Sequence, residues 1–176
     1  MTWLPYFAYG SNLHPLRLRL RACSARKIGR AVLRGYSLRF HKRGLDGSSK
    51  CDAVLTGRRE DMLQGIVYRV AKRDWRALDR AEDLGRGYER VRLCVSVGSR
   101  RRVVYAYRAR PGAIVQGLRP FDWYLDYVVR GALYHGLSRR YIRTIAGEWV
   151  VRDRNAARRT CNLGISSRGG KPLRSR

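Results

Sequence analysis

The sequence is poor in acidic residues, in histidine and in long apolar runs, and each shortage excludes a class of protein. It holds only 13 Asp and Glu residues and three His residues, with no Cys-x-x-Cys or His-Glu-x-x-His pair. These signatures of zinc sites are missing, so we expect no metal and no cofactor. No apolar run reaches the roughly 20 residues that cross a bilayer, and the N-terminus lacks the layout of a signal peptide. We therefore expect a soluble, cytoplasmic protein.

The motifs that bind nucleotide phosphates are also missing. Neither G-x-x-x-x-G-K-[ST] nor a complete G-x-G-x-x-G occurs, which argues against nucleotide hydrolysis. The three histidines are scattered, and we expect them at the surface or in loops rather than at a metal. The four cysteines are widely spaced, which predicts ordinary reduced thiols. These residues are His14, His41, His135, Cys23, Cys51, Cys94 and Cys161.

Positive charge is present in excess. The chain has 39 Lys and Arg residues, of which 34 are Arg, and a formal net charge of +26. Arg binds phosphate through its planar fork, so nucleic-acid binding is one interpretation, and GC-rich coding without functional meaning is another. The Arg residues occur in almost every segment, whereas nucleic-acid binders usually concentrate them on one face or in one arm. This distribution weakens the nucleic-acid interpretation and leaves a field that attracts anionic substrates.

The length of 176 residues and the hydrophobic content of 44% suit one domain with one core. We place this domain at residues 1–151. From Arg152 to Arg176 the composition changes to Arg, Asn, Ser and Gly, which predicts a basic, poorly ordered tail.

Periodicity predicts both strands and helices within the domain. A strand is expected from Leu4 to Tyr9, and one strand from Ile28 to His41 followed by a flexible loop. Residues 15–23 alternate Leu and Arg like a strand but begin with Pro15 like a helix, so their structure stays open. Further strands are expected at 53–55 and 65–71, and a hairpin is expected from strands at 91–97 and 103–109. Three helices are expected. The first begins near residue 72, the second runs from behind Pro120 to near 136, and the third runs from 138 to about 146.

Two features carry candidate chemistry. The first is the passage from the strand into Gly10-Ser11-Asn12, where small residues allow successive backbone N–H groups to hold an anion. A plain turn that needs Gly10 explains it equally well. The second is Glu82, which shares a helical face with Trp75 and Leu78. Burial disfavours a charged carboxylate and makes Glu a proton carrier near neutral pH, although pairing with Arg86 or Arg90 would make it structural.

Together these residues resemble the γ-glutamylcyclotransferase family. The resemblance runs from about Tyr6 to about Ile145, and Phe40-His41-Lys42-Arg43 with Asp46-Gly47-Ser48 resembles a bacterial branch of it. It rests on Tyr6-Phe7-Ala8-Tyr9-Gly10-Ser11-Asn12-Leu13, Leu78-Asp79-x-x-Glu82, Gly87-Tyr88, Trp123-Tyr124, Gly131-Ala132 and His135-Gly136-Leu137.

The resemblance implies an α+β fold, a small mixed β-barrel with flanking helices, and a lyase of glutathione metabolism. Such an enzyme releases a γ-glutamyl group as 5-oxoproline when the substrate's own α-amine attacks its γ-carbonyl. Glu82 matches the catalytic base and acid, and the substrate-binding positions match Tyr6, Phe7, Ala8, Tyr9, Gly10, Ser11, Asn12, Leu13, Tyr88 and Tyr124. For the last two tyrosines, core packing with a surface hydroxyl is the alternative.

The expected partner is a small γ-glutamyl substrate, with room for weak, non-specific nucleic-acid binding through the basic surface and no membrane. The alternative function is an anion- or nucleic-acid-binding protein that keeps the fold without catalysis. One departure from the family is Asp83, where Gly is common. Neighbouring helical residues diverge by about 100°, so we expect Asp83 to face solvent. The loop from Arg43 to Lys50 also differs in detail, which leaves the leaving group open.

Overall fold

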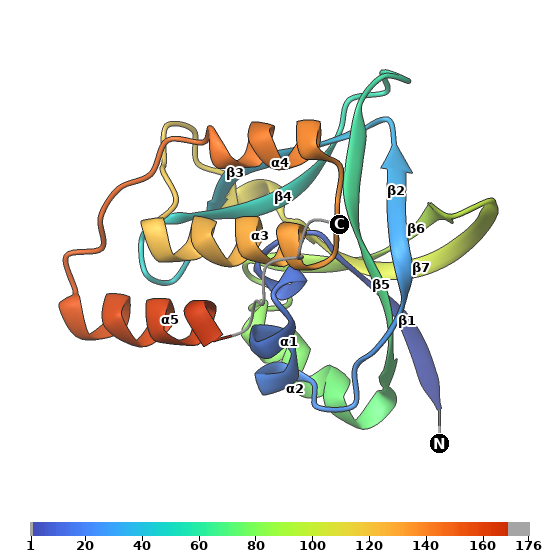
Figure 1. Cartoon of the computed structure of the whole chain (residues 1–176), viewed down its shortest axis with the longest axis horizontal. Coiled ribbons are helices and arrows are strands. Elements are labelled where there is room, and N and C mark those ends of the chain that lie inside the picture. Colours follow the sequence, from blue (N-terminus) through green and yellow to red (C-terminus); the bar gives the residue numbers. More distant parts are fainter. Residues whose placement is uncertain (1, 169–176) are drawn as a thin grey trace, which may run out of the picture.

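A computed structural model describes residues 2–168 of the chain. It has a closed, mixed five-stranded barrel and a separate two-stranded sheet. Helices lie on the outside (Figure 1). The seven strands are β1 (Trp3–Ala8), β2 (Arg26–Arg34), β3 (Tyr36–Arg43), β4 (Ser49–Leu55), β5 (Met62–Ala71), β6 (Tyr88–Val97) and β7 (Arg100–Ala109). The five α-helices are α1 (Pro15–Arg21), α2 (Trp75–Ala81), α3 (Asp122–Tyr134), α4 (Arg139–Ala146) and α5 (Ala156–Arg168). This confirms the α+β class.

The barrel runs in the order β1-β5-β2-β6-β7 and closes where β1 lies parallel to β7 at Tyr6 and Tyr105. Its other pairs are antiparallel. The predicted hairpin is confirmed as β6 and β7, whose register pairs Val97 with Arg100 around the tight turn at Gly98. Tyr6 and Val104 are among the side chains buried in the core.

The expected single strand from Ile28 to His41 is wrong, because two strands occupy this stretch. Gly35 has φ of 75°, a left-handed conformation that Gly adopts without strain, and there the chain leaves the barrel. Strand β2 pairs with β5 and β6 in the barrel, whereas β3 pairs with β4 in the second sheet. The loop after β3 is closed by a hydrogen bond from Gly44 N to Ser48 O of 2.8 Å. The β3–β4 sheet thus forms a separate wall beside the barrel.

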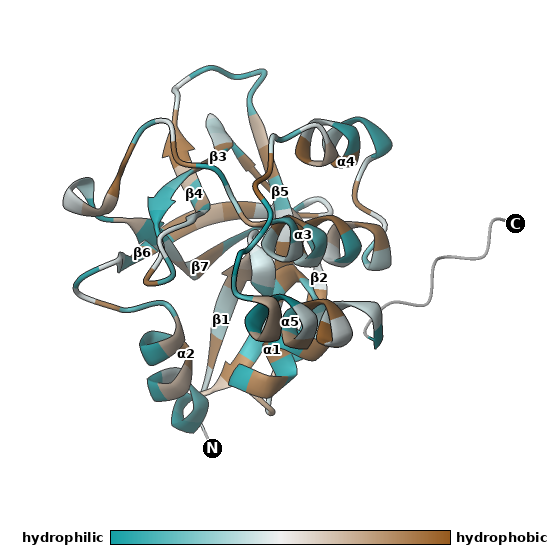
Figure 2. Cartoon of the chain, turned by 90° about the vertical axis from the view of Figure 1, so that its left-hand side faces the viewer, coloured by the Kyte–Doolittle hydropathy of each residue, from teal (hydrophilic) through white to brown (hydrophobic). Residues whose placement is uncertain are grey.

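The segment after His14, which the sequence left undecided between strand and helix, forms helix α1. Pro15 stands at its first position, where the missing N–H costs nothing, and the His14 ring accepts from Arg17 N. Helix α4 begins behind Ser138 as predicted, because Ser138 Oγ accepts from Tyr141 N. Helix α4 carries both apolar and polar residues, brown and teal in Figure 2, which suits a helix with one face on the protein.

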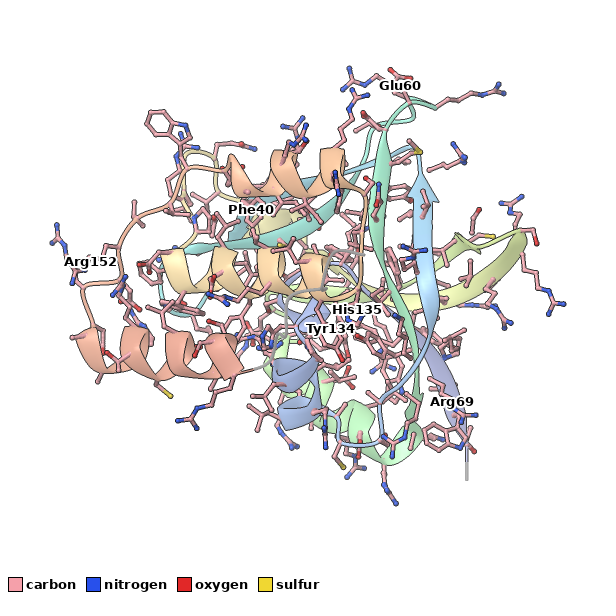
Figure 3. The ribbon with its side chains drawn as sticks, viewed as in Figure 1. Phe40, Glu60, Arg69, Tyr134, His135 and Arg152 are labelled. Carbon is pink, nitrogen blue, oxygen red and sulfur yellow. The ribbon has the colours of Figure 1, made fainter. Side chains whose placement is uncertain are left out.

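The predicted tail from Arg152 is wrong for residues 152–168. Helix α5 lies against α3 and α1, and its residue Ser166 is fully buried. Asp153 is also buried, where it binds Arg158 and the Trp123 indole. The low apolar content of this segment suggested disorder, but a segment can pack with few apolar residues when its buried polar groups are paired. Arg152, where the predicted tail begins, lies at the outer edge of the molecule (Figure 3). The last part of the predicted tail, residues 169–176, lies outside the described residues.

Two of the three histidines, His14 and His135, lie between regular elements as expected, but none of the three is exposed at the surface. His14 and His135 are buried, and His41 lies in β3 with its Nε2 at 2.8 Å from Asp52 Oδ2. His135 Nε2 lies 2.8 Å from the Tyr68 hydroxyl and 3.0 Å from Leu13 O. Burial lowers the pKa of His135 to about 4, because an apolar environment disfavours the charged ring. Among residues 2–168, no helix has the length and apolarity of a membrane span.

Candidate active site

A small cavity opens where β1 ends. We call it the inner cavity. Its walls come from β1 and the loop behind it, from β4, from the end of α2, from β6 and β7, and from α3. The lining residues are Tyr6, Tyr9, Gly10, Ser11, Asn12, Cys51, Glu82, Tyr88, Tyr107 and Tyr124. Residues from six distant segments therefore meet in one place.

The loop behind β1 supplies backbone donors. Ser11–Leu13 form one 3₁₀ turn, in which Leu13 N donates to Gly10 O at 2.9 Å. The N–H groups of Gly10, Ser11 and Asn12 have no acceptor within the described residues. The start of a helical turn leaves its first N–H groups unpaired, and they attract an anion. The geometry thus provides the donors that the sequence suggested.

Close packing holds this loop in place. A Cβ on Gly10 would stand 3.0 Å from the Cβ of Cys51, so the loop approaches β4 more closely than most side chains allow. On its other side, a Cβ on Gly131 of α3 would stand 2.5 Å from the carbonyl carbon of Leu13. Glycine at both positions lets the barrel loop lie directly between β4 and α3.

Glu82 is the carboxylate of the inner cavity. Helix α2 ends at Ala81, and the Glu82 side chain is only 14% exposed. Its Oε1 accepts from Asn12 Nδ2 at 2.9 Å and from Arg21 at 2.8 Å. Its Oε2 has no partner among the described residues and is not sealed from solvent. One oxygen is therefore held by the protein while the other is open to a substrate.

The ion pair of Glu82 is formed with Arg21, not with the arginines that the sequence suggested. Arg86 pairs with Asp83, and Arg90 pairs with Asp79. Arg21 also donates to Asn12 Oδ1 at 2.8 Å, and Asn12 donates to the Tyr6 hydroxyl at 2.7 Å. Tyr6, Asn12, Glu82 and Arg21 thus form one hydrogen-bonded network. No signal in the sequence marks Arg21, since its helix alternates Arg with Leu throughout.

Tyr88 and Tyr124 are buried and bind the backbone of Cys51 from two sides. The Tyr88 hydroxyl donates to Cys51 O at 2.6 Å, and the Tyr124 hydroxyl accepts from Cys51 N at 3.0 Å. The alternative with hydroxyls at the surface is therefore wrong. Burial raises the pKa of both tyrosines well above 10, because the charged phenolate is disfavoured there. Both therefore remain neutral.

The other predicted positions divide into two groups. Tyr6, Tyr9, Gly10, Ser11 and Asn12 line the inner cavity, whereas Phe7, Ala8 and Leu13 are buried in the core and do not line it. Alternation along β1 and the turn of the 3₁₀ helix direct successive side chains to different sides. The cavity also contains two residues that sequence reasoning missed, Cys51 and Tyr107.

Asp83 does not face solvent as expected. Helix α2 has already ended, and Asp83 has φ of 52°, so the 100° spacing of a helix does not apply. Its side chain is 14% exposed and lines a second pocket outside the inner cavity. We call this pocket the vestibule. Ser11, Glu82, Tyr88 and Tyr124 belong to both pockets, and the other vestibule residues are Arg17, Arg21, Lys42, Gly44, Leu45, Asp46, Lys50, Ala81, Asp83 and Trp123.

Two basic side chains of the vestibule, Lys50 and Arg17, are fixed by hydrogen bonds. Lys50 binds Asp46 at 2.7 Å and Ser48 Oγ at 2.6 Å, and burial lowers the pKa of Lys50 to about 8. Arg17 donates to Ser11 Oγ at 3.1 Å and to Asn162 of α5 at 3.2 Å. No cluster of three or more His, Cys, Asp or Glu side chains suited to a metal occurs within residues 2–168.

Comparison with solved structures shows the fold. A gamma-glutamyl cyclotransferase superposes with a TM-score of 0.81 at 20% identity, over 96% of this chain and 100% of that one. An uncharacterized protein of Homo sapiens gives 0.77 at 22%, over 86% and 90%. A gamma-glutamyl cyclotransferase from yeast, specific to glutathione, gives 0.58 at 12%, over 97% and 98%.

Comparison of sequences shows the family. No curated protein sequence matches the chain. The profile of the family described as gamma-glutamyl cyclotransferase, AIG2-like, matches residues 6–124, a stretch that contains every residue lining the inner cavity. The chain therefore belongs to the gamma-glutamyl cyclotransferase, AIG2-like family.

Proposed function

We propose that the protein is a γ-glutamylcyclotransferase that releases 5-oxoproline from a γ-glutamyl amide. The observation that carries the proposal is the open Oε2 of Glu82, which shares a small cavity with three unpaired backbone N–H groups. A carboxylate with one oxygen anchored and one open is suited to move a proton. Unpaired amides beside it are suited to hold an anion.

The reaction needs only groups that the cavity and the substrate supply. The substrate's α-amine attacks its own γ-carbonyl carbon, which forms the lactam C–N bond and a tetrahedral oxyanion. Glu82 takes the proton that the amine loses. When the oxyanion collapses, the bond to the leaving nitrogen breaks, and Glu82 returns the proton to that nitrogen. One carboxylate thus acts first as base and then as acid, and no water is consumed.

The rest of the inner cavity would bind and orient the γ-glutamyl group. The N–H groups of Gly10, Ser11 and Asn12 would hold its α-carboxylate or the oxyanion. The Tyr124 hydroxyl would donate to the substrate, and the buried ring of Tyr88 would shape the wall. Because ring closure is intramolecular, the main task of the cavity is to hold the substrate folded.

The test is 5-oxoproline release from γ-glutamyl amino acids, γ-glutamyl amines and glutathione. Glu82→Gln keeps the shape of the side chain and removes the proton acceptor, so kcat should fall by about 10²- to 10⁴-fold. The matched control is Glu89→Gln on β6, where the side chain is 40% exposed and outside both pockets. No product from any substrate would refute the proposal and favour an anion-binding protein without catalysis. Equal activity of Glu82→Gln would refute the role of Glu82 alone.

A further inference from the structure

Lys42 is a buried lysine in the vestibule whose ammonium has no hydrogen-bond partner in the described part of the chain. It lies in β3, its residue is 4% exposed, and within residues 2–168 its ammonium donates to no acceptor. The ammonium is nevertheless not sealed from solvent, because it is not among the fully covered polar atoms without partners. Burial lowers the pKa of Lys42, since an apolar environment disfavours its charge. Such a group costs folding free energy unless something binds it.

The carboxylates around the vestibule are already paired with other cations. Glu82 binds Arg21, Asp46 binds Lys50, and Asp83 binds Arg86. These three carboxylates act electrostatically on the Lys42 ammonium, but none lies within 4.0 Å of it. The vestibule lining itself has four cations against three carboxylates. The excess positive charge is therefore available to an anion from outside.

Of the two vestibule cations without a carboxylate, Lys42 is the one whose donors are unused. Arg17 donates to Ser11 and Asn162, and its guanidinium lies 4.3 Å from the centre of the Tyr127 ring. The Lys42 ammonium has only a contact with the Tyr88 ring, 4.6 Å from its centre. A cation over an aromatic face is held loosely and keeps its three N–H donors for another acceptor.

Lys42 lies in the pocket that would hold the leaving group of the substrate. Glu82 and Tyr88 belong to both pockets, so the vestibule continues outward from the point where the scissile bond would lie. The inner cavity is occupied by the γ-glutamyl part, and the leaving group extends into the vestibule. This step rests on the proposed function. A free carboxylate on the leaving group would then lie beside the unpaired ammonium.

We propose that Lys42 determines specificity by binding a carboxylate on the leaving group, so that the enzyme prefers γ-glutamyl compounds whose amine part is anionic. The binding would be a charge-assisted hydrogen bond, which is roughly twice as strong as a neutral one. Gly87 makes room for it. A Cβ on Gly87 would lie 2.5 Å from Lys42 Nζ, so any side chain there would displace the ammonium.

The experiment compares γ-glutamylalanine with γ-glutamylalaninamide, which differ in one charge and hardly in size. The wild-type protein should show a kcat/KM about 10- to 100-fold higher for γ-glutamylalanine, the range of one charge-assisted hydrogen bond. Lys42→Met keeps the stem on Tyr88 and should reduce this ratio to about one. The control Lys72→Met changes an exposed lysine outside both pockets and should keep the ratio. Thermal unfolding verifies that each variant is folded.

A second variant tests position without removing the charge. Gly87→Ala would move the ammonium, and it should also lower the ratio while Lys42 remains present. If Lys42→Met fails to fold, the kcat/KM ratio of Gly87→Ala tests the role of Lys42 instead. Turnover of both compounds with equal kcat/KM in the wild type would refute the role of Lys42 and leave the proposed function intact. An equal loss for both compounds in Lys42→Met would also refute it, and no 5-oxoproline from either would refute both proposals.

Discussion

In the inner cavity, Tyr6, Asn12, Glu82 and Arg21 are joined by four hydrogen bonds, whereas the Lys42 ammonium in the vestibule donates to no acceptor within residues 2–168. The two pockets also differ in which segments support them. All inner cavity residues lie within the family match at 6–124, while the vestibule residue Arg17 is held by Asn162 of α5, beyond it. The difference suggests that the inner cavity performs the chemistry common to γ-glutamyl substrates and that the vestibule selects among them.

The largest effect is expected from removing residues 152–176, which takes away helix α5 and its contact with Arg17 of the vestibule. Helix α5 covers the buried Tyr127, contributes Leu163 and Ile165 to the core edge, and places Ser166 O on His14. Loss of these two partly buried apolar side chains should cost about 3 kcal/mol in the free energy of unfolding. Urea denaturation measures this change. Unchanged stability would mean that the sequence interpretation of a dispensable tail holds despite α5.

A change in the inner cavity gives the next largest effect. Arg21→Met removes the cation from Glu82 and one partner of Asn12, so the carboxylate loses its fixed position. A misplacement of this kind costs about 100-fold in kcat. The matched control is Arg108→Met, whose pair with Glu89 is about 40% exposed on both sides and lies outside both pockets. Surface pairs of this kind contribute little, so the control should be nearly wild type. If both variants lost equal activity, the network would not be what positions Glu82.

A smaller effect is expected from pH, through a histidine behind the loop of the inner cavity. His135 Nε2 lies 3.0 Å from Leu13 O, and Figure 3 shows His135 at the end of α3. Its pKa is about 4 in the folded chain and 6.5 otherwise, so the unfolded state binds more protons between these values. Stability is therefore full above pH 6.5 and falls by about 2 kcal/mol between pH 6.5 and about pH 4.5.

Denaturant titrations at several pH values measure this fall. His135→Gln should flatten the dependence on pH, but not abolish it, because burial also lowers the pKa of His14. The same slope in the wild type and in His135→Gln would contradict the assignment to His135.

Much of the local structure could be predicted from the sequence, because it depends on neighbouring residues. The hairpin of β6 and β7 followed from alternation around Gly98-Ser99, and the start of α4 followed from Ser138. The predictions failed where a single local feature changed the direction of the chain. Gly35 divides one apolar run into β2 and β3, and the early end of α2 turns Asp83 into the vestibule.

The candidate site could be predicted only in part, for the same reason. Tyr6 to Asn12 and Glu82 stand in recognisable motifs, so their candidacy is visible in the sequence. Arg21 and Lys42 are two among 39 basic residues, and nothing in their neighbours marks them. Their importance comes from contacts with residues far along the chain.

The sequence by itself determined a basic, single-core chain of strands and helices, a loop of small residues after a strand, and one candidate catalytic Glu near the end of a helix. These follow from periodicity and residue type, which act over a few residues. Only the tertiary structure decided that Arg21 anchors one oxygen of Glu82 while the other stays open, that α5 supports Arg17, and that the buried Lys42 ammonium meets no acceptor among residues 2–168. Burial and pairing depend on which segments the barrel and its second sheet bring together, and that is set by packing over the whole chain.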